Sequence, residues 1–364
     1  MPRSLYLHVP FCPKICPYCD FHKMRRSEGL VAAYLKRLRA EALDLYAEFP
    51  DALDTVYFGG GTPSHLKDDE LTFVVETLRE TWGFPALQET TLEADPLTFD
   101  RARLETFRAL GFDRLSIGLQ SAQDDVLKFL GRQHTGREGL SAVEMALDAG
   151  FTVSADLITA VPGQDAAQDL HTLAQTFVPH VSVYNLTVEP NTPFARRGVR
   201  VDEDKEADDY ALADEILSGY GLGRYEVSSH AKPGFEAKHN GVYWSGEHFL
   251  ALGPSAASFV PSPGLIGERR TNLPIKGWLA GEKPDVLPVD SETFVQDVLM
   301  TGLRTRRGVA TDDLSRRAGF DVKARYHDVL HSLNDIGLTE YCGPYLRVTP
   351  AGLLQLNRVV AAFF

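Results

Sequence analysis

The stretch SLYLHVPFCPKICPYCDFH, residues 4–22, contains three of the four cysteines of the chain within eight residues. Cys12, Cys16 and Cys19 form a C-x3-C-x2-C pattern, which lets three thiolates converge from one loop. Thiolates are the usual protein ligands of iron–sulfur clusters, and a 4Fe–4S cluster normally takes four. Three ligands would leave one iron open to a small molecule, which is the arrangement that a reaction site needs.

The same pattern allows two other interpretations. Three cysteines and His22 could hold a structural zinc ion in a tetrahedron, or the thiols could carry no metal. The cysteines follow a short apolar segment, Leu5–Val9, and their loop contains Pro10, Pro13 and Pro17. Structural zinc sites tend to pair two short ligand turns, and no second Cys/His pair follows here at finger spacing.

Length and composition indicate an ordinary globular protein. A chain of 364 residues can bury a sizeable core, and it suggests one large domain with a smaller one. The formal net charge of −13 argues against non-specific nucleic-acid binding. No apolar run is long enough for a membrane span, and the N-terminus does not resemble a signal peptide. With clustered rather than paired cysteines, these features predict a protein of the reducing cytoplasm.

The first 220 residues alternate between strand-like and helix-like segments. Six such β–α units predict a parallel sheet, either open or closed into a barrel. No G-x-G-x-x-G follows the first strand, so a dinucleotide-binding fold is disfavoured. The predicted strands are Leu5–Val9, Thr55–Phe58, Thr90–Glu93, Arg114–Leu119, Thr152–Ile158 and His180–Leu186; the helices include Gly29–Ala47, Asp68–Thr81, Phe99–Leu110 and Glu138–Ala149.

Polar residues and glycines collect at the carboxyl ends of these strands, where α/β proteins place their active sites. Residues 59–63, GGGTP, would let a ligand approach the backbone closely, although a tight turn explains them too. Glu93 could accept from an ammonium group or be a surface acid before a turn. Gln120 can donate and accept, and the Arg132 guanidinium suits a carboxylate. Asp156 lies in an apolar strand and needs a ligand or a structural partner, either Arg114 or Arg132.

Together these motifs resemble the radical SAM superfamily, in which the fourth iron of the cluster binds exchangeable S-adenosylmethionine (SAM). The pattern Y-x-H-x-P-F-C-x3-C-x-Y-C resembles the group of oxygen-independent coproporphyrinogen III oxidases and their HemW-type relatives. The oxidases usually carry a further cysteine where this chain has Phe21, which resembles the HemW type. The resemblance implies an α/β fold with a partial (β/α)6 barrel and one 4Fe–4S cluster on the three cysteines. It also implies SAM contacts from Tyr6, Gly60, Gly61, Thr62, Glu93, Gln120, Arg132 and Asp156.

Residues 238–244, KHNGVYW, contain a second motif. Taken alone, His239 would be a hydrogen-bonded surface histidine, and Tyr243 and Trp244 would be core or rim aromatics. However, H-N-x-x-Y-W resembles a HemW-type motif associated with heme, and a neutral imidazole is a common axial ligand. Relatives often carry a histidine in the following turn, where this chain has Ala257. The candidate ligands here are therefore His239, Tyr243, His230 and His248.

The remaining segments predict an extension and a small terminal domain. Residues 225–228 suggest an edge strand, and residues 261–288 an irregular Pro- and Gly-rich linker with one amphipathic piece around Trp278. We expect three parts: residues 1–220, 221–288 and 289–364. The last part resembles a winged helix, with helices at Glu292–Leu303, Thr311–Ala318 and Lys323–Ile336, a two-stranded wing at Leu338–Val348 and a closing helix at Leu353–Phe364, whose final Phe363-Phe364 pair could contact the barrel.

These features lead to three functional hypotheses. The first is a HemW-type heme chaperone that binds heme and passes it to an apo-haemoprotein, using a cluster and SAM. The alternative is an oxygen-independent coproporphyrinogen III oxidase-type enzyme, which would decarboxylate its substrate oxidatively through SAM-derived radicals. A DNA-binding redox regulator is a minor third, because residues 290–364 contain nine Lys/Arg and nine Asp/Glu and so lack a basic surface.

Overall fold

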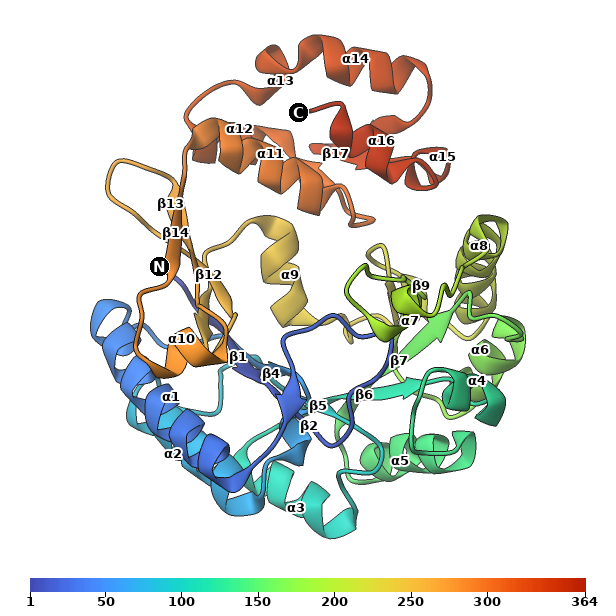
Figure 1. The fold of residues 1–364 in the computed structure, drawn as a ribbon. Coiled ribbons are helices and arrows are strands. Elements are labelled where there is room, and N and C mark those ends of the chain that lie inside the picture. The colour runs from blue at the N-terminus through green and yellow to red at the C-terminus, as the bar shows by residue number, and fades with distance from the viewer.

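The computed structural model describes all residues, 1–364, and is built around a nine-stranded sheet (Figure 1). Its strand order is β11-β1-β4-β5-β6-β7-β8-β10-β9. The six central strands are parallel, as the sequence predicts, with bounds within about two residues of the predicted ones. They are β1 (Ser4–Val9), β4 (Thr55–Gly60), β5 (Glu89–Ala94), β6 (Arg114–Gln120), β7 (Thr152–Thr159) and β8 (His180–Asn185).

The outer strands extend this sheet without closing it. β11 (Leu250–Leu252) pairs in parallel with β1, and β10 (Ser229–Ala231) pairs antiparallel with β8 and with β9 (Gly223–Arg224). No hydrogen-bonded ladder joins β11 to β9, so the sheet is a partial barrel. The predicted edge strand at residues 225–228 is wrong, because this segment is the connection between β9 and β10.

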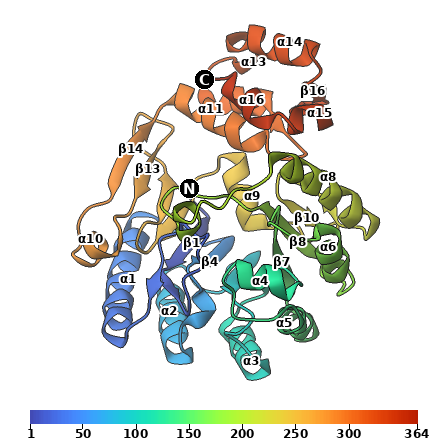
Figure 2. The ribbon, with the colours of Figure 1, turned by 45° about the vertical axis from the view of Figure 1, so that its right-hand side comes forward.

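Helices cover the outer face of the sheet (Figures 1 and 2). The covering helices are α1 (Glu28–Glu48), α2 (Asp68–Glu80), α3 (Arg101–Leu110), α4 (Asp124–Phe129), α5 (Gly136–Asp148), α6 (Ala166–Ala174) and α8 (Glu203–Gly219). Their starts follow capping rules: Asp100 accepts the N–H of Arg103, and Thr135 forms a reciprocal capping box with Glu138. Short elements complete this part: β2 (Phe11–Cys12), β3 (Met24–Arg25), a 3-10 turn at Pro63–His65 and α7 (Pro193–Arg196).

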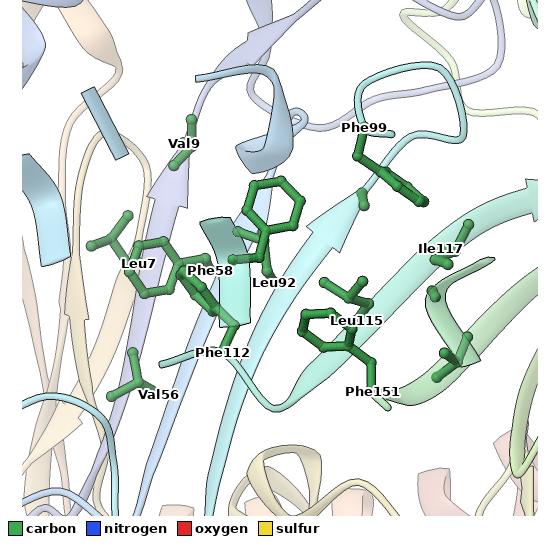
Figure 3. Packing of buried hydrophobic residues seen from close by; sticks show 14 of the residues in the cluster. Leu7, Val9, Val56, Phe58, Leu92, Phe99, Phe112, Leu115, Ile117 and Phe151 are labelled. Carbon is green, nitrogen blue, oxygen red and sulfur yellow. The ribbon is translucent and has the colours of Figure 1, made fainter. Parts of the chain in front are cut away.

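The main core lies between this sheet and its covering helices and contains 50 buried residues. Because parallel strands are covered on both faces, they are apolar along most of their length. Figure 3 shows Phe58 of β4 beside Phe112, with ring centroids 4.9 Å apart in an edge-to-face arrangement. Leu92 and Leu115 of the next two strands continue the same layer. This packing holds the strand ends in fixed positions above the core.

Residues 261–288 are not an irregular linker, so that prediction is wrong. They include β13 (Gly267–Thr271) and β14 (Asp285–Val289), which form an antiparallel sheet with β12 (Ala257–Val260). The prolines and glycines lie mainly in the turns, and Pro288 lies on an edge strand, where a missing N–H is tolerated. The amphipathic piece is confirmed as α10 (Ile275–Leu279), whose Trp278 is buried in the main core.

A second core of 20 buried side chains lies mainly in the C-terminal residues and includes Phe259 of β12 and Val289 of β14. The predicted helices and wing are present, but two predicted helices are broken and β15 adds a third strand to the wing. Phe363 packs on Tyr326 of this same core rather than on the barrel. The segments are α11 (Ser291–Gly302), β15 (Val309–Ala310), α12 (Thr311–Ala318), α13 (Val322–Arg325), α14 (His327–Asp335), β16 (Thr339–Cys342), β17 (Tyr345–Val348), α15 (Pro350–Leu353) and α16 (Leu356–Ala361).

Helix α9 (Lys238–Ser245) lies between these two parts of the molecule. It contacts β4 on one side and α11 on the other, and Figures 1 and 2 both draw it between the sheet and the C-terminal helices. None of the helices is long and apolar enough to cross a membrane.

Candidate functional site

A cavity of about 410 Å³ opens at the carboxyl ends of the parallel strands. Its wall brings together residues from the cysteine loop and from β4, β5, β6 and β7, which are far apart in the sequence. The sequence-predicted residues that line it are Cys12, Cys16, Cys19, Gly60, Gly61, Thr62, Glu93, Gln120, Arg132 and Asp156. Tyr6, His239, Tyr243 and Trp244 do not line it.

The cysteine loop is held against the barrel by short backbone pairings. Phe11 and Cys12 pair in parallel with β3, and the Thr62 N–H donates to the Phe11 carbonyl at 2.9 Å. All three thiols are free, and burial raises the pKa of Cys12 to about 11 and also raises that of Cys19. A bound metal would have to offset this burial by stabilising the thiolates.

The zinc alternative needs three thiolates and His22 around one point, which this structure does not show. No three His, Cys, Asp or Glu side chains converge on one ion position. His22, the fourth member of the zinc alternative, accepts the backbone N–H of Ile275 at its Nε2, 3.3 Å away. In a 4Fe–4S cluster each thiolate binds a different iron, so the sulfurs need only line one cavity, as these three do.

Gly60 ends β4 and Gly61 follows it, and neither position has room for a side chain. Gly60 has a φ of +112°, and a Cβ there would lie 2.5 Å from the His8 ring. A Cβ on Gly61 would lie 2.8 Å from the carbonyl carbon of Pro10. The positive φ of Gly60 favours glycine strongly, as the turn interpretation of this stretch expects. The close approach of a ligand to this backbone stays a prediction.

Two carboxylates face the cavity from β5 and β7, the strands on either side of β6. Burial, opposed by a hydrogen bond from the Tyr57 hydroxyl and reinforced by the nearby Asp156, raises the pKa of Glu93 to about 7. The Tyr57 hydroxyl donates to Oε1 at 2.8 Å, and the Gly60 N–H donates to Oε2 at 3.0 Å. Burial also raises the pKa of Asp156 to about 6, although Ser116 donates to it at 3.2 Å. Such a pair suits a cationic ligand group.

Arg132 reaches across the cavity wall to the cysteine loop. Its guanidinium pairs with Asp95 at 2.7 Å, donates to the Gly118 carbonyl at 2.9 Å and lies 3.7 Å from the Cys16 sulfur. Its Nε is buried and has no partner. The alternative in which Asp156 pairs with an arginine in a salt bridge is wrong, because Arg114 pairs instead with Glu89, at 3.3 Å.

Gln120 ends β6 in a conformation that non-glycine residues rarely adopt. Its φ is +67°, and the register between β6 and β7 shifts at this point. Backbone strain of this kind is common where a side chain is aimed at a ligand. The Gln120 side chain lies over Gly118, where a Cβ would approach its Nε2 to 2.8 Å.

Tyr6 supports the cavity from behind instead of lining it. Its hydroxyl lies 3.0 Å from His8 Nδ1, and its ring stacks on Tyr57 at 6.2 Å between centroids. A substitution at Tyr6 would therefore act through Tyr57.

The H-N-x-x-Y-W motif forms α9, and its histidine is not on the surface. His239 is 1% exposed, with Nδ1 2.8 Å from Thr55 Oγ1 and Nε2 2.8 Å from the Tyr243 hydroxyl. Tyr243 and Trp244 are half-buried, and the Trp244 Nε1 has no hydrogen-bond partner. Of the motif, Asn240 lines the cavity.

Sequence reasoning missed several residues of the cavity wall: Tyr57, Asp95, Ser182, Tyr184 and Asn240. A period-two signal could have found two of them. Tyr57 alternates with buried Val56 and Phe58, and Ser182 alternates with buried Val181 and Val183. Asn240 carries no such signal, because its position depends on how α9 docks.

Comparison with known proteins identifies the family. Residues 6–175 match the model of the radical SAM superfamily, and residues 289–354 match that of the HemN C-terminal domain. The heme chaperone HemW of Bacillus subtilis is 31% identical over 99% of this chain and 99% of its own length. That of Mycobacterium tuberculosis is 35% identical over 99% of this chain and 94% of its own. The chain belongs to the HemW family.

Other likenesses agree with this placement. The heme chaperone HemW of Escherichia coli is 30% identical over 100% of this chain and 98% of its own length. The solved structure of coproporphyrinogen III oxidase (HemN) from Escherichia coli superposes with a TM-score of 0.85 at 21% identity, covering 100% of this chain and 90% of that one. At that identity the likeness confirms the fold. Membership of the radical SAM superfamily implies a 4Fe–4S cluster and SAM.

Proposed function

We propose that this chain is a heme chaperone that carries a 4Fe–4S cluster and SAM, binds heme as cargo and transfers it to an apo-haemoprotein. The observation that carries the proposal is the full-length likeness to heme chaperones of the HemW family. A cytoplasmic site of action fits the cysteine pattern and remains a prediction.

The cofactor part of the proposal assigns Cys12, Cys16 and Cys19 to the cluster. They line one cavity on one loop, and Phe21, 62% exposed, stands where the oxidases usually carry a further cysteine. Three ligands leave one iron for SAM. A reduced cluster of this kind can supply an electron to SAM and so provide radical chemistry.

The SAM part assigns roles by charge and by shape. Glu93 and Asp156 suit the cationic groups of SAM, and the Arg132 guanidinium lies where it can reach a carboxylate. Gly60 and Gly61 line the cavity without a side chain, while Thr62 and Gln120 offer polar atoms in the same wall. Tyr6 contributes indirectly by stacking on Tyr57.

The heme part places the cargo near α9, with Tyr243 and Trp244 as flat aromatic contacts. Trp244 keeps an unpartnered Nε1, and both residues are half-buried between the sheet and α11. His239 can ligate iron through Nε2 only if the Tyr243 hydroxyl moves away from that atom. His230 and His248 remain alternative ligands.

The test is a heme titration of anaerobically reconstituted protein, with and without SAM, followed at the Soret band. A shortened side chain at Trp244 (Trp244→Ala) is expected to weaken saturable, stoichiometric binding. The matched control is the double variant His327→Ala/His331→Ala, because these exposed histidines lie one helical turn apart and could bind heme adventitiously. If wild-type binding does not saturate, or if only the control loses it, the chaperone proposal fails.

A transfer assay completes the test. Heme-loaded protein mixed with an apo-haemoprotein is expected to pass its heme on, which restores the acceptor's own Soret spectrum. The second candidate, a coproporphyrinogen III oxidase-type enzyme, is supported by the shared fold alone. Decarboxylation of coproporphyrinogen under anaerobic reducing conditions with SAM would favour that enzyme over the chaperone.

A further inference from the structure

Helix α9 forms part of the floor of the cavity and is anchored to the barrel at its first turn. No side chain of its own caps this turn. Instead, the buried Glu89 at the start of β5 accepts the N–H groups of Lys238 and His239, at 3.1 and 3.0 Å, and pairs with Arg114. A carboxylate at a helix N-terminus satisfies free N–H groups and complements the helix dipole. The position of α9 is therefore fixed from the barrel side.

One aromatic stack connects α9 with the carboxylate in the cavity. The His239 ring lies parallel to the Tyr57 ring, 5.2 Å between centroids, and Tyr6 stacks on Tyr57 at 6.2 Å. Tyr57 in turn donates its hydroxyl hydrogen to Glu93. The direction of that hydroxyl depends on the ring plane, and His239 is one of the two rings that contact this plane.

The hydrogen bonds of His239 fix its tautomer. The Thr55 hydroxyl donates its hydrogen to Ser4, so His239 Nδ1 must be the donor toward Thr55. Nε2 then accepts from the Tyr243 hydroxyl. Burial lowers the pKa of His239 to about 3, which keeps the ring neutral. The single lone pair of the ring is therefore already used within the protein.

We propose that His239 is a positioning residue of the SAM cavity, which holds Tyr57 against Glu93 while the neighbouring Asn240 completes the floor. That SAM is the ligand rests on the proposed function. It follows that α9 connects the surroundings of Tyr243 with the SAM cavity. A group that draws the Tyr243 hydroxyl away from His239 changes the contact between the His239 and Tyr57 rings, and therefore the cavity. The same helix touches α11, so the link extends to the C-terminal part.

The experiment compares two substitutions of His239 by the dissociation constant of SAM on reconstituted protein. His239→Ala removes the ring, whereas His239→Phe keeps a flat ring but no iron ligand. We expect His239→Ala to weaken SAM binding about tenfold, roughly the contribution of one well-placed hydrogen bond, and His239→Phe to restore most of it. An unchanged SAM affinity in His239→Ala, or no rescue by His239→Phe, would overturn the proposal.

Two further variants keep the result interpretable. Tyr57→Phe keeps the ring that stacks on His239 and loses only the hydroxyl that donates to Glu93. It therefore tests whether this hydrogen bond matters for SAM binding even if His239→Ala does not fold. Combined with His239→Ala it should weaken binding no more than the worse single change, because both act through one contact. His171→Ala is the control, since the exposed His171 contacts the Tyr220 ring away from the cavity.

Failure of this inference is distinguishable from failure of the chaperone proposal. SAM binding in these variants is measured without heme, whereas the Soret titration tests the cargo. If His239 is instead an iron ligand, both variants lose the heme ligand signature and the SAM affinity does not differ between them.

Discussion

The upper wall and the floor of the same cavity differ in how they are built. The upper wall consists of strand ends and the cysteine loop, and ten of the residues singled out in the sequence lie in it. The floor is α9, a short helix whose motif we expected to present a histidine for heme. Its histidine is buried and hydrogen-bonded at both nitrogens instead. Strand ends converge because the sheet is parallel, whereas the face that a helix presents depends on tertiary docking.

The largest expected effect concerns the upper wall. Replacing Cys16 by alanine should abolish stable cluster incorporation, because two thiolates cannot hold a 4Fe–4S cluster with one iron left for SAM. Iron and sulfide content and the visible absorbance of the reconstituted protein measure this. Cys342→Ala is the matched control, since Cys342 is exposed on the wing. A cluster retained in full by Cys16→Ala would refute the ligand assignment.

The next effect concerns how the floor is anchored. Glu89→Gln leaves the Arg114 charge buried without its partner and weakens the cap of α9. We expect the free energy of unfolding to fall by about 3–5 kcal/mol, the usual cost of breaking a buried ion pair from one side. Urea denaturation measures it.

A surface pair provides the comparison for that value. Glu340→Gln removes the partner of Arg347 on the exposed wing, where such pairs contribute at most about 1 kcal/mol. Equal losses in the two variants would mean that Glu89 does not anchor α9 in the way described.

A third prediction concerns the pH dependence of SAM affinity, which we expect to arise from Glu93 in the upper wall and not from α9. Glu93 has a pKa of about 7, so it is protonated below that pH and loses its attraction for a cationic ligand. SAM affinity should therefore decline as pH falls through about 7, by up to tenfold per pH unit for one linked proton. Glu93→Gln should bind SAM weakly and keep only the step of Asp156 near pH 6, which titration calorimetry across pH 6–8 can show.

The same raised pKa has the opposite consequence for stability. The folded protein binds this proton more tightly than the unfolded chain, so Glu93 contributes stability at low pH that is lost as pH rises through about 7. Without SAM, the free energy of unfolding of the wild type should fall as pH rises from 4.5 to about 7. That of Glu93→Gln should change less. A wild-type affinity that is flat with pH would contradict the role given to Glu93.

The contrast also shows what the sequence could predict. Thr55–Phe58 and Thr90–Glu93 alternate or run apolar between turn residues, so their pairing and the meeting of their ends follow from general rules. Tyr6 lies within β1 and not at its carboxyl end, so the sequence could not show whether its ring reaches the cavity or packs on Tyr57. The segment at 261–288 was misread because proline and glycine mark turns without revealing the short strands between them.

The smallest expected effect concerns the end of α9 that faces the C-terminal part. Arg317 donates to the carbonyls of Ser245 and Gly246, which end α9, and its guanidinium lies over the Phe294 ring. Arg317→Ala should lower the free energy of unfolding by about 1–2 kcal/mol, the usual contribution of a hydrogen bond from a charged group. Arg316→Ala is the matched control on the same helix, because Arg316 is 75% exposed and pairs only with Asp313. If Arg317→Ala also weakens SAM binding while Arg316→Ala does not, α9 transmits its position from α11 to the cavity floor; if neither does, the floor is set from the barrel side by Glu89 alone.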